Sequence, residues 1–247
     1  MKHLSLGLIM PLFIMLVCTS CANSHASAGA SPQVMRPTQV LDFNALYGEN
    51  CAGCHGSQGK GGAAVPLSDP VFLAIADDAT IRRIAANGVP GTPMPAFAQS
   101  AGGMLADKQL DAIVSGIRSR WANPDVLRDA NPPTYRALGP GDPVHGAAAY
   151  ATYCSSCHGS DGRGGKKASS IVDGSYLALV SDQDLRTNVI IGRPELGAPD
   201  WRGDVPGKPM SGQEVSDVVA WLAAQRPNVP GQPYRTPSPK PVKGELP

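Results

Sequence analysis

One twelve-residue pattern occurs twice in this chain of 247 residues. Residues 51–62 read CAGCHGSQGKGG, residues 154–165 read CSSCHGSDGRGG, and eight of the twelve positions are identical. Both copies keep Cys-x-x-Cys-His, followed by glycines at the same spacing. This feature constrains the fold most, because each half of the chain must fold around the group that its two cysteines and its histidine bind. The repeat predicts two similar domains in tandem.

Cys-x-x-Cys-His is the attachment sequence of a c-type haem. Two thiols three positions apart reach the two vinyl groups of the porphyrin and form thioethers. The histidine that follows then faces the iron as its proximal ligand. We therefore expect two covalently bound haem c groups, held by Cys51, Cys54 and His55 and by Cys154, Cys157 and His158.

Three other uses of paired cysteines explain the pattern less well. A zinc ribbon places its two Cys-x-x-Cys pairs about 15–20 residues apart, much closer than here. Thioredoxin-like redox chemistry needs a βαβ context, and no strand-rich pattern surrounds these sites. Structural disulfides do not require a histidine after each second cysteine.

Residues 40–226 resemble tandem class I cytochromes c, close to the domains of dihaem cytochromes and of the cytochrome subunits of respiratory oxidases. The resemblance implies an all-α fold of two class I cytochrome c domains, with short helices and long loops wrapped around the haems. Gly146 stands where the family has a glycine that lets this helix approach the last one. The first repeat has Phe43 there and departs from the pattern.

Helix signals agree with this resemblance. Asp142 followed by Pro143 predicts the start of a helix before the second attachment motif. Apolar residues at helical spacing predict a closing helix in each repeat. We expect Asp107 to be the N-cap of the first closing helix, and Ser211–Glu214 to form a capping box at the start of the second.

Composition and turn residues divide the rest of the chain. Prolines without periodicity separate the two repeats, and the end of the chain is rich in proline. We expect an export signal over residues 1–20, a flexible tether over 21–39, a first cytochrome c domain over 40–121, a linker over 122–141, a second domain over 142–226 and a Pro-rich tail over 227–247.

The N-terminus predicts export. Lys2 and His3 precede an apolar run over residues 4–17, which is shorter than the roughly 20 residues of a membrane-spanning helix. Two cleavage sites stay open. Residues 26–28, Ala-Ser-Ala, fit ordinary signal cleavage, whereas residues 18–21 resemble a bacterial lipobox that would leave a lipid on Cys21, with cysteine at position 18 where leucine is usual. The expected location is the bacterial periplasm or the outer face of the membrane.

The resemblance also implies a methionine as the sixth iron ligand, since class I cytochromes close the iron with a thioether. In the first repeat the matching stretch, residues 91–97, reads GTPMPAF and nominates Met94, with Met104 as the fallback. In the second repeat the ungapped alignment puts Ala198 opposite Met94, and alanine cannot bind iron.

Met210 is the other candidate for the second haem. Residues 205–210, VPGKPM, match residues 89–94, VPGTPM, at five of six positions, which narrowly favours a displaced ligand. Against this, an alignment on the closing helices pairs Met210 with Leu105, a packing position. Both alternatives stay open.

The expected function is single-electron transfer between redox proteins of the cell envelope in a respiratory-type chain. Expected partners are a quinol–cytochrome c reductase-type complex, a terminal oxidase or a dehydrogenase. The net charge of +1, with both repeats acidic, gives no indication of nucleic-acid binding, and we expect membrane association only through a lipid anchor. An electron carrier is favoured over an enzyme. The alternatives are a fixed electron-entry subunit of an oxidase or dehydrogenase, and a peroxidase-like dihaem enzyme with an open second haem.

Overall fold

The computed structural model describes residues 35–128, 130–203, 205 and 207–227. These residues form helices and isolated β-bridges but no strand, and the prediction of an all-α fold is confirmed. None of the described helices combines the length and the apolar character needed to cross a membrane. The export signal, Cys21 and most of the Pro-rich tail lie outside the described residues.

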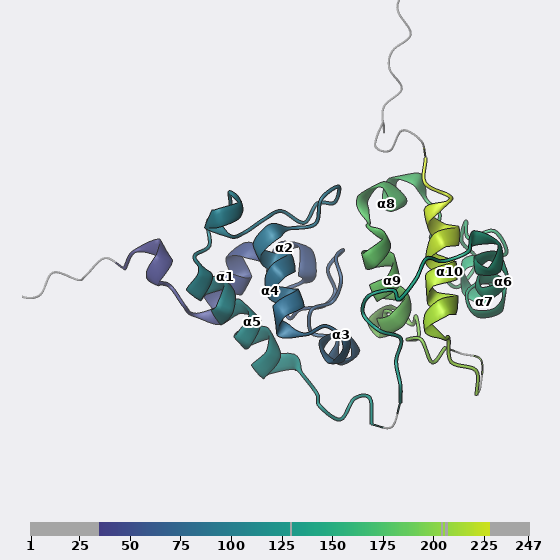
Figure 1. Cartoon of the computed structure of the whole chain (residues 1–247), viewed down its shortest axis with the longest axis horizontal. Helices are drawn as coiled ribbons and strands as arrows, with labels where there is room; N and C mark the ends of the chain where they lie inside the picture. The colour runs from purple at the N-terminus through teal and green to yellow at the C-terminus, as the bar shows by residue number, and fades with distance from the viewer. Residues whose placement is uncertain (1–34, 129, 204, 206, 228–247) are drawn as a thin grey trace, which may run out of the picture. The chain divides into compact units, whose positions relative to one another are not determined.

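The helices form two successive sets of the same kind (Figure 1). The first set consists of α1 (Phe43–Asn50), α2 (Ala52–His55), α3 (Pro70–Ile75), α4 (Asp78–Asn87) and α5 (Asp107–Trp121), with the 3₁₀ turns η1 (Pro37–Gln39) and η2 (Gln99–Ala101). The second set consists of α6 (Pro143–Tyr153), α7 (Ser155–His158), α8 (Gly174–Leu179), α9 (Asp182–Ile191), η3 (Pro194–Leu196) and α10 (Gly212–Ala223).

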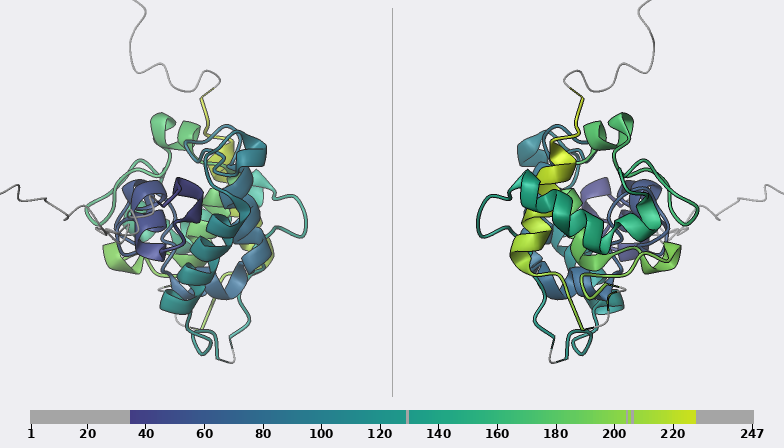
Figure 2. Two further views of the ribbon diagram at one scale, coloured as in Figure 1. Left: turned by 90° about the vertical axis from the view of Figure 1, so that its left-hand side faces the viewer. Right: turned by 90° about the vertical axis from the view of Figure 1, so that its right-hand side faces the viewer.

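The closing helix of each set is the packing centre. In the first set α5 packs against α1 and α4, and in the second α10 packs against α6 and α9. The right-hand view in Figure 2 shows α6 crossing α10. The buried faces of α5 and α10 carry the apolar stripes expected from the sequence, so the closing helices are confirmed.

The helix starts of the second set follow the sequence signals. The Asp142 carboxylate accepts hydrogen bonds from the backbone N–H of Val144 at 2.7 Å and of His145 at 3.3 Å. At α10, Ser211 Oγ accepts from the N–H of Glu214 at 3.2 Å, and the Glu214 carboxylate accepts from the N–H of Ser211 at 2.8 Å. Both predicted caps are confirmed, and each satisfies N–H groups that have no partner within the helix.

The cap expected for α5 is wrong. Ala106 is the N-cap, and Asp107 is the first helical residue. Gln109 Oε1 accepts from the N–H of Ala106 at 3.1 Å, and the Asp107 carboxylate pairs instead with Arg82 at 2.9 Å. The helix therefore begins without a capping side chain at its N-cap, because that residue is alanine.

In both repeats the first helix crosses the last helix at a glycine, but the glycine lies on the first helix in one repeat and on the last helix in the other. A Cβ added to Gly146 on α6 would lie 2.0 Å from the carbonyl oxygen of Asp217 on α10, so glycine permits a backbone-to-backbone approach. In the first repeat the small residue is on the other helix. A Cβ added to Gly116 on α5 would lie 2.0 Å from the ring of Phe43 on α1. Phe43 thus fills a space that Gly116 leaves.

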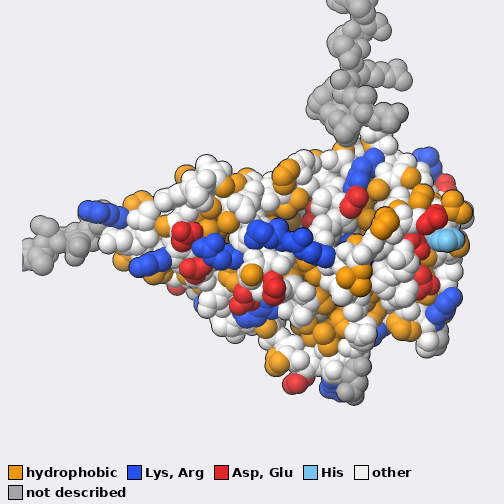
Figure 3. Space-filling model, in the orientation of Figure 1, with side chains coloured by type: hydrophobic (Ala, Val, Ile, Leu, Met, Phe, Trp, Pro, Cys, Tyr) orange, Lys and Arg blue, Asp and Glu red, His pale blue; other side chains and the backbone are white. Residues whose placement is uncertain are grey.

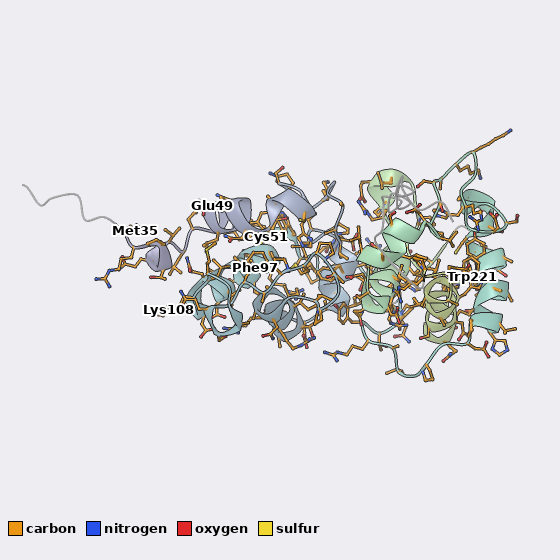
Figure 4. The ribbon with its side chains drawn as sticks, turned by 90° about the horizontal axis from the view of Figure 1, so that it is seen from above. Met35, Glu49, Cys51, Phe97, Lys108 and Trp221 are labelled. Atoms are coloured by element: carbon orange, nitrogen blue, oxygen red, sulfur yellow. The ribbon has the colours of Figure 1, made fainter. Side chains whose placement is uncertain are left out.

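In each repeat a tryptophan packs against the tyrosine that lies four residues before the attachment motif. The two tryptophans occupy different positions relative to their closing helices. Trp121 meets Tyr47 edge to face with 5.2 Å between ring centroids, and Trp221 stacks on Tyr150 at 4.3 Å. Figure 4 labels Trp221, which lies where α10 meets α6. The aromatic pair packs the helix that leads into each attachment motif against the closing helix.

Candidate haem attachment sites

The backbone places the two attachment motifs in one geometry. Cys51 ends α1 and begins α2, with φ −119° and ψ −37°; Cys154 ends α6 and begins α7, with φ −117° and ψ −30°. Cys51 lies at this helix junction within the first repeat (Figure 4). The single helical turns α2 and α7 then carry the second cysteine and the histidine of each motif.

Each motif histidine is held by a backbone carbonyl. Nδ1 of His55 lies 2.7 Å from the carbonyl oxygen of Val65, and Nδ1 of His158 lies 2.8 Å from that of Ser169. A carbonyl can only accept, so Nδ1 carries the proton and donates it, and Nε2 keeps a free lone pair. Burial lowers the pKa of His55 from its ordinary value, which favours the neutral ring that a metal needs.

A glycine directly after each motif allows the chain to make a tight turn there. Gly56 and Gly159 adopt left-handed backbone conformations with φ of +83° and +82°. A Cβ added to Gly56 would lie 1.9 Å from the carbonyl oxygen of Lys60, so no other residue fits there. The tyrosine four residues before each motif fixes this turn: Tyr47 Oη donates to the carbonyl of Gly56 at 2.8 Å, and Tyr150 makes the same bond to Gly159.

The four motif cysteines are free thiols. Burial, and then the neighbouring Cys54 thiol, raises the pKa of Cys51 to about 11. Burial and Cys157 raise the pKa of Cys154 to about 11 as well. The described residues contain no cluster of three or more His, Cys, Asp or Glu side chains able to hold a metal ion. Paired thiols on one helical turn beside an oriented imidazole fit a covalently attached haem, and they do not fit a zinc ribbon.

Met94 lies on the loop between α4 and η2. Its backbone is fixed, because its carbonyl accepts from the N–H of Val89 at 3.0 Å and its own N–H bonds to Thr92 Oγ1 at 3.2 Å. The Met94 side chain is half-buried and lies outside the apolar core. The fallback, Met104, is exposed on the surface. Met94 is thus the half-buried methionine of the first repeat that does not belong to the core.

The second repeat places Ala198 where the first has Met94. Gly88 follows α4 with φ +67°, and a Cβ there would lie 2.7 Å from the carbonyl oxygen of Met94. Gly192 follows α9 with φ +68°, and a Cβ there would lie 2.7 Å from the carbonyl oxygen of Ala198. The same glycine turn therefore supports the two residues, as the ungapped alignment predicts.

Met210 occupies the position of Leu105. Leu105 donates its backbone N–H to the carbonyl of Phe97 at 2.7 Å, and Met210 donates to the carbonyl of Trp201 at 2.8 Å. Both side chains belong to the apolar core, with exposed fractions of 6% and 7%. The structure thus places Met210 at a packing position immediately before α10.

Sequence reasoning missed three arginines that hold the domains together. Arg186 on α9 is buried, and it donates to the carbonyl oxygens of Thr134 and Tyr135 and to Ser216 Oγ. Arg118 on α5 connects that helix to the segment from α3 to the start of α4, and Arg226, just after α10, connects to the segment from α8 to the start of α9. Their partners are Leu73, Ala76 and Asp78 for Arg118, and Leu177, Val180 and Asp182 for Arg226. Most of these acceptors are backbone carbonyls. Because every residue type has a carbonyl, the sequence does not indicate which ones an arginine will contact.

Comparison with known proteins agrees with this geometry. A family profile described as cytochrome C oxidase, cbb3-type, subunit III, matches residues 38–115 and 141–222, one segment for each repeat. The cytochrome bc1 complex cytochrome c subunit of Mycobacterium tuberculosis H37Rv is 24% identical over 181 residues, which cover 72% of this chain and 60% of that protein. The cbb3-type cytochrome c oxidase subunit CcoP of Azospirillum is 30% identical over 164 residues, 60% of this chain and 50% of that protein.

Among solved structures, a chain of the Kuenenia stuttgartiensis reducing HAO-like protein complex shares 19% identity with a TM-score of 0.41, over 78% of this chain and 100% of that one. This chain spans 50–60% of the length of the two curated relatives above. Since the profile covers both repeats and each repeat carries a complete attachment motif, the chain belongs to the cytochrome c family described as cbb3-type cytochrome c oxidase subunit III, with two cytochrome c domains in tandem.

Proposed function

We propose that this chain is an exported dihaem c-type cytochrome that carries single electrons between redox proteins of the cell envelope. The observation that carries the proposal is the repeated arrangement of two free thiols and a histidine whose Nδ1 bonds a backbone carbonyl. A haem held there would supply a reversible one-electron couple between ferric and ferrous iron.

The chain's own residues would position the haem and set its environment. The carbonyls of Val65 and Ser169 orient the two histidines, and the tyrosine bonds keep each attachment turn in place. Met94 is the proposed sixth ligand of the first haem. A thioether is a soft ligand that favours ferrous iron and raises the reduction potential, so the first haem would be the better electron acceptor of a pair in which only it has such a ligand.

The surface charge fits docking between proteins. On the face drawn in Figure 3, Lys and Arg side chains are interspersed with Asp and Glu side chains. The proposed partners are the members of a respiratory chain that donate or accept one electron.

A fixed subunit is the second candidate, favoured by the names of the relatives, which are subunits of a bc1 complex and of a cbb3 oxidase. The two candidates separate in a gentle membrane extraction. A subunit should co-purify in fixed ratio with integral membrane proteins that contain haem or copper, whereas a free carrier should elute alone.

The primary test is the number of covalent haems. Denaturing mass spectrometry of the mature protein should give the polypeptide mass plus two haems. Cys154→Ala should weaken or abolish attachment at the second site only, and Cys51→Ala at the first only. Ser155→Ala is the matched control, since residue 52 of the first motif is already alanine; it should keep both haems. A zinc-loaded chain without covalent haem would contradict the proposal.

A further inference from the structure

The second repeat lacks a methionine that is free to bind iron. Met210 is buried in the core, its N–H is bonded to Trp201, and the next residue begins the capping box of α10. Withdrawing the Met210 side chain to bind iron would open a cavity at the place that Leu105 fills in the first repeat. Such a loss in a packed core costs about 2–5 kcal/mol for a methionine side chain.

The loop from Arg193 to Ala198, which follows α9, is also held in place by hydrogen bonds. Arg193 and Ala198 exchange two backbone hydrogen bonds of 3.0 Å each, and η3 lies between them. The Arg193 side chain pairs with Glu195 at 2.6 Å and donates to the carbonyl oxygen of Gly62 at 3.1 Å. These bonds hold Ala198 at the position of Met94 and leave little freedom for the loop to bring in another residue.

Other described side chains that bind iron are also committed or distant in sequence. Met35 precedes the first domain, Met104 belongs to it, and both side chains are exposed. His145 lies on the exposed side of α6 beside Asp142. Lys208 lies over the ring of Tyr153.

We propose that the second haem, attached at Cys154, Cys157 and His158, has no protein ligand at its sixth position. It therefore binds a small exogenous ligand there, such as carbon monoxide or another uncharged diatomic molecule in the ferrous protein. The inference rests on the proposed function, because it presupposes two haems. Ligand binding adds a bond to iron and transfers no electron.

Carbon monoxide titration of the ferrous protein tests this on the full mature chain. The haem count by denaturing mass spectrometry is measured on the same sample. Two haems and one carbon monoxide per chain is the expected result. With fewer than two haems the proposed function itself fails; with two haems and no carbon monoxide bound, the function stands and this inference fails.

Three variants assign the open site. Met210→Leu, which restores the residue of the first repeat, should leave one carbon monoxide per chain. Met94→Leu should raise the number to two. Ala198→Met, which puts a methionine at the position that Met94 has in the first repeat, should lower it to none and add a second methionine–iron charge-transfer band to the ferric spectrum. If wild type binds none and Met210→Leu binds one, Met210 is the ligand and the inference is wrong.

Discussion

Replacing Gly146 by alanine should separate the two helices that carry the second repeat. The added Cβ would lie 2.0 Å from the carbonyl oxygen of Asp217, 2.6 Å from its carbonyl carbon and 2.8 Å from Cβ of Trp221. Two of these atoms are backbone and cannot rotate away. To restore ordinary contact, α6 and α10 must move apart by about an ångström, and the stacking of Trp221 on Tyr150 would loosen with them.

The expected cost follows from overpacking. Forcing a methyl group into a packed core costs about 1–3 kcal/mol, and the backbone clash puts Gly146→Ala at the upper end of that range. For a domain of this size, a loss of about 2–3 kcal/mol lowers the melting temperature by roughly 10–20 °C. Thermal unfolding followed by helical circular dichroism and by haem absorbance would measure the shift.

Two glycines serve as graded controls. Gly48 on α1 has no atom within 4 Å of an added Cβ, so Gly48→Ala should be neutral or stabilise by up to about 1 kcal/mol through helix propensity. Gly116→Ala meets the ring of Phe43, a side chain that can shift, and should fall between the other two. A loss below 1 kcal/mol for Gly146→Ala, or the reverse order of the three variants, would refute the close-crossing argument.

Three further predictions concern the buried charge of Arg186, the titration of Tyr47 and the lipidation of Cys21. Arg186→Met should destabilise the second repeat by about 1–3 kcal/mol in denaturant unfolding, because several buried acceptors lose their donor; an unchanged midpoint would count against this clamp. Burial raises the pKa of Tyr47 from 10.0 to about 12, so its stabilisation should be complete below pH 10 and be lost as the pH rises through about 12, by about 2–3 kcal/mol; Tyr47→Phe should remove that part of the alkaline loss, and identical pH profiles would contradict the assignment. If Cys21 is lipidated, the protein should partition with membranes and Cys21→Ser should release it, whereas a native N-terminus at Gly29 would exclude the lipid.

The sequence by itself determined the chemistry and the class of fold. Cys-x-x-Cys-His carries both attachment cysteines and the proximal histidine within five consecutive residues, so the motif can be recognised without knowledge of distant contacts. Asp142 and the Ser211–Glu214 box act on N–H groups within the same turn, and both were predictable for that reason. Two copies of such a local motif were enough to predict two helical domains.

Only the tertiary structure decided which residues meet across the chain. Phe43 departs from the family glycine, and the compensating Gly116 lies on another helix, so no local pattern joins them. Asp107 was expected to cap α5, but Arg82 of α4 pairs with its carboxylate. Local similarity favoured Met210 through five matching residues, whereas the backbone bond to Trp201 places it with Leu105. Sequence similarity records neighbours along the chain, while the position of a side chain is set by the packing and hydrogen bonds of segments that fold against it.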